Sequence, residues 1–142
     1  MTEKKAVQPS WDDTFTVGVA ELDDQHRNLF RILEGLRRAL EAADGKEAPL
    51  KGLRALARDC SVHFSTEEGY MERFGYPGAV KQRVQHRLFA ARLDHLLDRV
   101  QTGEEVLSES TVDELRSWLL GHIVGLDREY ADFFREKGLG LR

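Results

Sequence analysis

The sequence predicts an all-α protein, an antiparallel up-down four-helix bundle with an extended N-terminal arm. Four long stretches carry apolar residues every three or four positions, which is the period of one helix face. Short segments with glycine or proline separate these stretches. Helices joined by short loops pack as antiparallel neighbours, and 142 residues suffice for one core. We therefore expect a single domain over residues 1–142.

The expected limits of the helices follow from where this periodicity starts and stops. Pro49 suits the first turn of a helix, and Gly75-Tyr76-Pro77-Gly78 forces a turn. Ser110 or Thr111 is the expected N-cap of the last helix. The predicted elements are an arm over 1–21, which Trp11 anchors, and helices over about 23–43, 49–74, 79–101 and 110–137.

Composition and charge narrow the class of protein. Of all residues, 41% are hydrophobic and 32% are charged, which is typical of a globular domain. Acidic residues outnumber basic ones by 25 to 21 without a basic stripe, so we do not expect nucleic acid as a partner. A single cysteine excludes an internal disulfide, and no apolar run is long enough to span a membrane. We expect a cytoplasmic protein without a membrane partner.

Four of the five histidines fall on the inward stripes of four different helices. They are His26, His63, His86 and His122. One buried histidine is more often a satisfied core residue than a ligand, but a bundle core offers few hydrogen-bond partners to four imidazoles. The fifth, His95, follows His86 by nine residues and is expected on the outer face of its helix.

Two acidic residues accompany these histidines. Glu67 follows His63 by four residues, so both side chains share one helix face; considered alone, they could simply form an ion pair. Asp127 follows His122 by five residues, so it reaches a shared centre only by bridging two ions or through a local distortion of the helix. Mixed imidazole and carboxylate ligation suits iron, manganese or zinc. Cys60 is expected to be a buried structural thiol.

Three blocks of sequence carry a wider pattern. They are Trp11 with Gly18-Val19 and Leu22-Asp23-Asp24-Gln25-His26; His63-Phe64 with Glu67-Glu68, Met71 and Gly75-Tyr76-Pro77; and Trp118-Leu119 with His122-Ile123, Asp127 and Tyr130. In this order and spacing they resemble the hemerythrin family, specifically the bacterial single-domain hemerythrins. The resemblance covers nearly the whole chain.

The resemblance implies a non-haem di-iron protein that carries, stores or senses dioxygen, with an oxo or hydroxo group between the two irons. The implied ligands are His26 and His63 on one iron, His86 and His122 on the other, and Glu67 and Asp127 as bridges. Dioxygen would bind the iron that His26 and His63 hold. Peroxide, nitric oxide and small anions are further candidate ligands, and the sequence names no protein partner.

The resemblance also suggests roles for neighbouring residues. Trp118, Leu119 and Ile123 flank His122 where the family has its oxygen pocket, and ordinary core packing is their alternative role. The groups expected to hold the imidazoles in place are Asp23, Gln25 and Tyr130. The inward residues expected in the last helix are Leu115, Trp118, Leu119, His122, Ile123, Leu126, Tyr130 and Phe133.

One position departs from the family pattern, which has a pair of histidines on the third helix. Here the first of the pair is Gln82, and only His86 remains. Because an amide is a poor iron ligand, the second iron is expected to keep an open or water-filled position. A peroxidase- or oxidase-like di-iron enzyme is therefore a second hypothesis. A helical interaction module with a vestigial or zinc-filled site is a third, and we favour oxygen binding over both.

Overall fold

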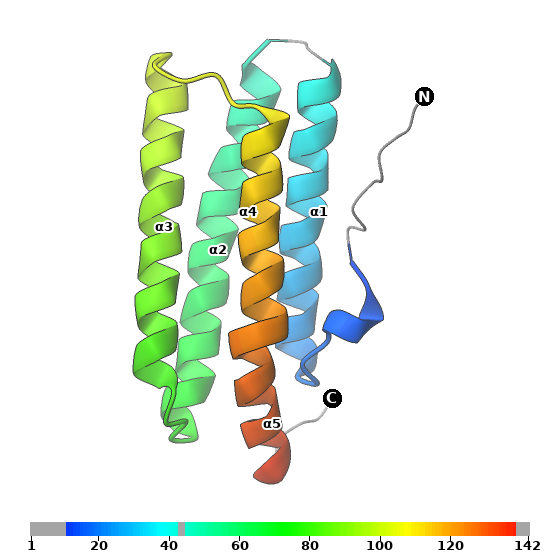
Figure 1. The fold of residues 1–142 in the computed structure, drawn as a ribbon, viewed down its shortest axis with the longest axis vertical. Coiled ribbons are helices and arrows are strands. Elements are labelled where there is room, and N and C mark those ends of the chain that lie inside the picture. The colour runs from blue at the N-terminus through cyan, green and yellow to red at the C-terminus, as the bar shows by residue number, and fades with distance from the viewer. Residues whose placement is uncertain (1–10, 43–44, 139–142) are drawn as a thin grey trace.

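The computed structural model describes residues 11–42 and 45–138, and within these ranges it confirms an all-α bundle of four helices. The first three are α1 (Ala20–Ala42), α2 (Glu47–Arg73) and α3 (Ala79–Thr102). The fourth consists of α4 (Glu109–His122), a π-helical turn η2 (Ile123–Asp127) and α5 (Arg128–Glu136). The four lie side by side, with the loops at the two ends of the bundle (Figure 1). No described helix is long and apolar enough to cross a membrane.

The helix ends largely follow the sequence signals. Pro49 lies in the first turn of α2, and Gly103 closes α3 in the left-handed conformation, with φ at 86°. The fourth helix differs, because Ser108 rather than Ser110 or Thr111 is its N-cap. The Ser108 hydroxyl accepts a hydrogen bond from the backbone N–H of Thr111 at 3.1 Å, and its extended backbone places it just outside the helix.

A buried carboxylate ties the N-terminal segment to the start of α1. After the short helix η1 (Asp13–Phe15), Asp23 accepts hydrogen bonds from the backbone N–H groups of Val17 at 2.7 Å and Gly18 at 3.2 Å. α1 therefore begins before residue 23, the predicted start. Both carboxylate oxygens of Asp23 accept hydrogen bonds from the backbone, so this residue supports the fold. The suggestion that it holds an imidazole is wrong. The first ten residues of the predicted arm lie outside the described residues.

The π-helical turn η2 changes which residues of the fourth helix face inward. Its hydrogen bonds span five residues, so Asp127 returns to the side of the helix that His122 faces. Beyond the turn, Tyr130 and Phe134 are fully buried, whereas Phe133 is only half-buried. Phe133, predicted to lie in the core, is half-buried like Trp118 and Leu126, which were predicted to face inward with it. For Phe133 the reason is that the prediction assumed an uninterrupted α-helical period.

The core contains two apolar clusters with a layer of polar side chains between them. On α1, His26 lies between Leu22 of the smaller cluster and Leu29 of the larger one. On α2, Glu67 likewise lies between Cys60 of the larger cluster and Met71 of the smaller one. On the fourth helix, Asp127 lies between Leu119 of the larger cluster and Tyr130 of the smaller one. Cys60 is a free, buried thiol in the larger cluster, as predicted. The fold thus encloses the candidate ligands on both sides along the bundle axis.

Gly78 lies in the turn between α2 and α3 and packs closely against the ring of Tyr76. A Cβ atom at this position would lie 2.7 Å from Cε2 of Tyr76, whose ring packs edge-on against Tyr130 and Phe133. We expect Gly78→Ala to displace the Tyr76 ring and to destabilise the protein by roughly 1–3 kcal/mol. Thermal unfolding measures this loss.

Gly35→Ala is the matched control. Gly35 is exposed within α1, and an added Cβ there meets no atom within 4 Å. This change should stabilise the protein by about 0.5–1 kcal/mol, because alanine has the higher helix propensity. Equal stabilisation by both changes would show that the packing of Tyr76 on Gly78 is dispensable.

Candidate metal centre

The six predicted ligands come together in the polar layer between the two apolar clusters. They are His26 from α1, His63 and Glu67 from α2, His86 from α3, His122 from the end of α4 and Asp127 from the end of η2. Each of these residues is at most 8% exposed. Their donor atoms form two sets that share Glu67, and within each set the atoms lie within 4.8 Å of one another. Groups of this chemistry and size can hold a metal ion.

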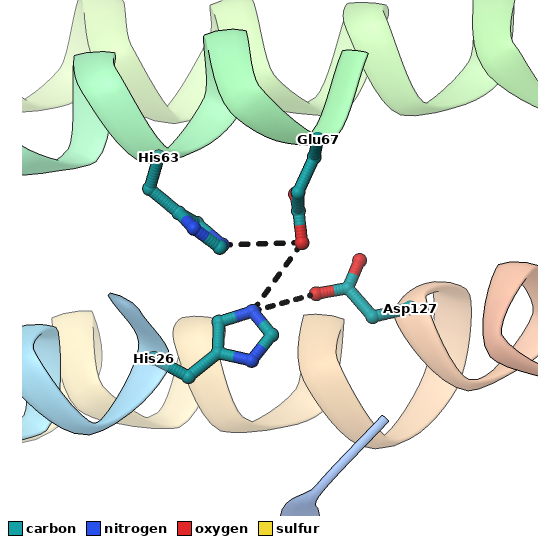
Figure 2. A group of neighbouring side chains, drawn as sticks. All are labelled: His26, His63, Glu67 and Asp127. Atoms are coloured by element: carbon teal, nitrogen blue, oxygen red, sulfur yellow. Dashed lines mark hydrogen bonds and ion pairs between the residues drawn. The ribbon is translucent and has the colours of Figure 1, made fainter. Parts of the chain in front are cut away.

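The first donor set contains His26, His63, Glu67 and Asp127, and Figure 2 shows these side chains converging from three helices. Oε2 of Glu67 lies 3.3 Å from Nε2 of His26 and 3.1 Å from Nε2 of His63. Oδ2 of Asp127 lies 3.3 Å from the same nitrogen of His26. Two imidazoles and two carboxylates therefore face a common point.

The second donor set contains Glu67, His86 and His122. Here the other oxygen of Glu67, Oε1, lies 3.1 Å from Nε2 of His86. The other oxygen of Asp127, Oδ1, lies 3.2 Å from Nε2 of His122. Each carboxylate therefore faces the first donor set with one oxygen and the second with the other, which is the arrangement of a bridging ligand.

Several of these donor atoms are buried without a hydrogen bond. Within the part of the chain that the structure describes, this applies to Oε1 of Glu67, Nε2 of His86 and Nε2 of His122, which together make up the second donor set. It also applies to Oδ2 of Asp127. Each of these four atoms faces another donor atom at 3.1–3.3 Å without hydrogen-bond geometry, and a buried polar atom without a hydrogen bond costs roughly 1–3 kcal/mol. One cation in each set would satisfy these atoms together, so the residues fit metal ions.

Burial and charge have opposite effects on the pKa values of the site. Burial alone lowers the pKa of His26, but hydrogen bonds with Asp127 and Glu67 outweigh it and raise this pKa to about 9. Burial alone raises the pKa of Glu67, but the charge of His63 and hydrogen bonds with the facing imidazoles hold it well below its ordinary value. An ionised carboxylate at this depth creates a negative field, which a proton or a metal dication neutralises.

Two side chains fix the orientation of imidazoles from outside the donor sets. Oε1 of Gln25 lies 2.7 Å from Nδ1 of His63, and Oε2 of Glu68 lies 2.7 Å from Nδ1 of His86. Contacts at Nδ1 set the ring angle and leave Nε2 to face the centre. Sequence reasoning expected Gln25 but missed Glu68, because a contact between α2 and α3 has no fixed spacing in the sequence.

Tyr130, which belongs to the smaller apolar cluster, holds Glu67 in place. Its fully buried O–H donates a hydrogen bond of 2.5 Å to Oε2 of Glu67. Burial, with the nearby charges of Asp127 and Glu67, raises the pKa of Tyr130 well above its ordinary value, so the phenol keeps its proton. Tyr130 therefore acts as a permanent donor to Glu67, whereas the sequence suggested that it would hold an imidazole.

Aromatic rings cover the second donor set. Trp118 stacks on His122 with ring centroids 4.7 Å apart, and Phe64 stacks on His86 at 4.0 Å. Leu119 and Ile123, on either side of His122 in the sequence, are each 1% exposed. The three residues predicted for the oxygen pocket thus lie by the second donor set, and their role towards dioxygen stays a prediction. Phe64 was not predicted as a covering ring.

Two further residues of α3 that the sequence singled out, Gln82 and His95, have different positions. Gln82 is 1% exposed and lies inside the site, where its Nε2 donates a hydrogen bond of 2.9 Å to Oδ1 of Asp127. His95 is exposed, as predicted, and its Nδ1 is 2.9 Å from Nη1 of Arg99. The histidine missing from the family pattern is therefore not replaced by His95.

Fold and site together define a cation-binding helical bundle with buried histidine and carboxylate clusters. The sequence matches the family Hemerythrin HHE cation binding domain over residues 17–134. The chain therefore belongs to the hemerythrin family, as its three sequence blocks predicted.

Individual relatives agree with this assignment. The chain is 31% identical over 122 residues to a bacteriohemerythrin of Stenotrophomonas maltophilia (strain R551-3), over 86% of this chain and 78% of that protein. It is 31% identical over 120 residues to myohemerythrin-1 of Phascolopsis gouldii, over 84% of this chain and 89% of that protein. A crystal structure of wild-type hemerythrin superposes with a TM-score of 0.83 at 26% identity, over 89% of this chain and 97% of that one.

The hydrogen bond between Tyr130 and Glu67 can be tested without any metal. Tyr130→Phe keeps the ring and removes the donor, so we expect the metal-free protein to lose roughly 1–3 kcal/mol of unfolding free energy. Urea denaturation in the presence of a chelator measures the loss. Tyr76→Phe is the control, because the Tyr76 side chain makes no hydrogen bond within residues 11–42 and 45–138. Equal losses in the two variants would refute a stabilising bond to Glu67.

Proposed function

We propose that this protein binds dioxygen reversibly at a pair of iron ions held by the two donor sets. One observation carries the proposal: Glu67 and Asp127 each face both sets, one oxygen to each. Carboxylates that face two sites suit a pair of ions, and mixed imidazole and carboxylate donors suit iron. Bundle cores host di-iron carboxylate sites of this kind. We also propose that residues 1–142 form a single domain.

The proposed ligands divide between the two ions as the donor sets do. They are His26 and His63 for one ion, His86 and His122 for the other, and Glu67 and Asp127 for both. A bound pair of reduced irons would supply the electrons and the coordination position that dioxygen binding requires. The chain itself supplies orientation, through Gln25 on His63 and Glu68 on His86.

The chain also supplies a dry environment. We propose that Trp118, Leu119 and Ile123 line the space for dioxygen and keep water from it, since Trp118 stacks on His122 and Leu119 and Ile123 are buried apolar residues close to His122 in the sequence. An apolar shell restricts solvent access and so favours reversible binding over irreversible oxidation. The names of the relatives, bacteriohemerythrin and myohemerythrin-1, support an oxygen-related role over a purely structural one.

The test is the iron content and the absorption spectrum of the anaerobically reduced protein, before and after air. We expect two irons per chain, one for each donor set, and an absorption band that appears with air and disappears on deoxygenation. Less than one iron per chain after expression in iron-rich medium would overturn the proposal. That outcome would favour a helical interaction module with a vestigial or zinc-filled site.

Glu67→Ala tests the bridging role directly. Because Glu67 faces both donor sets, its loss should disturb both ions, and we expect less than half of the wild-type iron after reconstitution. Elemental analysis of the purified variant measures this. Glu72→Ala, an exposed change on the same helix, is the control and should keep the full content. Two irons per chain in Glu67→Ala would show that Glu67 is not a bridge.

A di-iron enzyme of the peroxidase or oxidase type is the second candidate, and one residue favours it. Gln82 places an amide where the family pattern has an imidazole, next to the second donor set. With one imidazole fewer, the second ion has a position to offer to an exogenous ligand. Rapid oxidation of a reducing substrate by peroxide in the iron-loaded protein would support this candidate over a carrier.

Gln82→His should restore the missing imidazole on the inward face of α3, one turn from His86. We expect the number of azide ions bound per iron pair to fall from about two to about one, and the oxygenated form to last longer. An azide titration followed by absorbance measures the number. Gln85→His, at a half-buried position of the same helix, is the control. An unchanged number in both variants would mean that position 82 does not reach the second ion.

A further inference from the structure

Gln82 makes a contact inside the centre that no ligand of the family pattern would make. Its side chain is 1% exposed, and its Nε2 is 2.9 Å from Oδ1 of Asp127, at the end of η2 in the fourth helix. Among the described residues, its Oε1 is buried and has no hydrogen-bond partner. Burying an amide is costly unless it is hydrogen-bonded, so the contact with Asp127 compensates the burial of the NH₂ group.

The chemistry of the contact decides which end of the amide faces Asp127. An ionised carboxylate only accepts hydrogen bonds, whereas an amide has one end that donates and one that accepts. The NH₂ group must therefore face Oδ1, and the carbonyl oxygen, the only atom through which an amide could bind a cation, is turned away from Oδ1. A hydrogen bond to a charged acceptor is also stronger than one between neutral groups.

We propose that Gln82 is a positioning residue that anchors Asp127 and does not ligate metal. Asp127 stands at the end of the π-helical turn η2, and Gln82 holds it from α3. This bond fixes the carboxylate with Oδ2 towards His26 and Oδ1 towards His122 before any metal binds. At the position where the family pattern has a histidine ligand, this chain has Gln82, which holds the proposed bridging residue Asp127. The effect on metal binding rests on the proposed function, whereas the bond itself does not.

The first experiment tests the bond in the metal-free protein. Gln82→Met keeps the length of the side chain and removes the donor, so with chelator present we expect the Tm to fall by roughly 5 °C. In an Asp127→Ala background the acceptor is already gone, and the same change should cost nothing. Gln85→Met, on the same helix and half-buried, is the matched control and should leave the Tm unchanged. An equal loss in both backgrounds would overturn the proposal, because the amide would then act by packing alone.

The second experiment separates an anchor from a ligand, and it does not require the Asp127→Ala variant to fold. Ferrous ions are titrated anaerobically into metal-free wild-type protein and into Gln82→Met. An anchor predicts that both bind the same number of ions, with the affinity of Gln82→Met lowered about 10- to 100-fold, as for the loss of a group that holds a ligand. Loss of one ion per chain in the variant would show that Gln82 is a ligand and would overturn the proposal.

The two experiments also separate this inference from the proposed function. If the wild-type protein takes up no ferrous ion, the di-iron proposal fails, while the Tm comparison still decides whether Gln82 anchors Asp127. If the wild-type protein loads fully and Gln82→Met shows neither a Tm loss nor a change in affinity, the anchor fails and the di-iron proposal stands.

Discussion

Two carboxylates buried among imidazoles are the constraint on which the rest of this structure depends. Glu67 and Asp127 are at most 1% exposed, and their burial is unfavourable unless cations or donors surround them. The bundle meets that condition from every side: imidazoles converge from all four helices, and Tyr130 and Gln82 add neutral donors. Much of the remaining core serves to hold these groups in a dry layer between two apolar clusters. The packing of the core and the chemistry of the site therefore depend on each other in this fold.

The π-helical turn η2 shows how the backbone adapts to that constraint. In an uninterrupted α-helix a residue five positions after His122 would point well away from it. The wider turn brings Asp127 back to the core, and the cost of its irregular hydrogen bonds is met by the contacts of the Asp127 carboxylate. π turns are often found at functional sites for this reason. The changed register then buries Phe134 instead of Phe133.

The sequence predicted the bundle and the gathering of His26, His63, Glu67, His86 and His122, because both depend on periodicity along single helices; Asp127 lies outside that period. The spacing of His63 and Glu67 on one helix face is a property of the helix itself. Contacts between helices were less accessible: Glu68 with His86 and Phe64 on His86 depend on how α2 and α3 are rotated about their axes. The π turn was foreseen only as a condition for Asp127 to reach the centre, since no residue in its segment marks a π turn by propensity.

The supporting contacts show which groups of the candidate centre do not depend on position 82. His63 and His86 each have a partner at Nδ1 on a neighbouring segment, and Glu67 has Tyr130, so these groups are held independently of α3 residue 82. Among the described residues of its own helix, Asp127 faces only the candidate ligand His122, and it stands at the end of an irregular turn. A hydrogen bond from an α3 side chain therefore stabilises Asp127 more than it would stabilise Glu67. An amide suits that task better than an imidazole, because a single-donor imidazole that points at a metal has no N–H left on that side for a carboxylate. On the proposed function, glutamine at position 82 gives up one metal contact and holds the proposed bridge Asp127 more firmly.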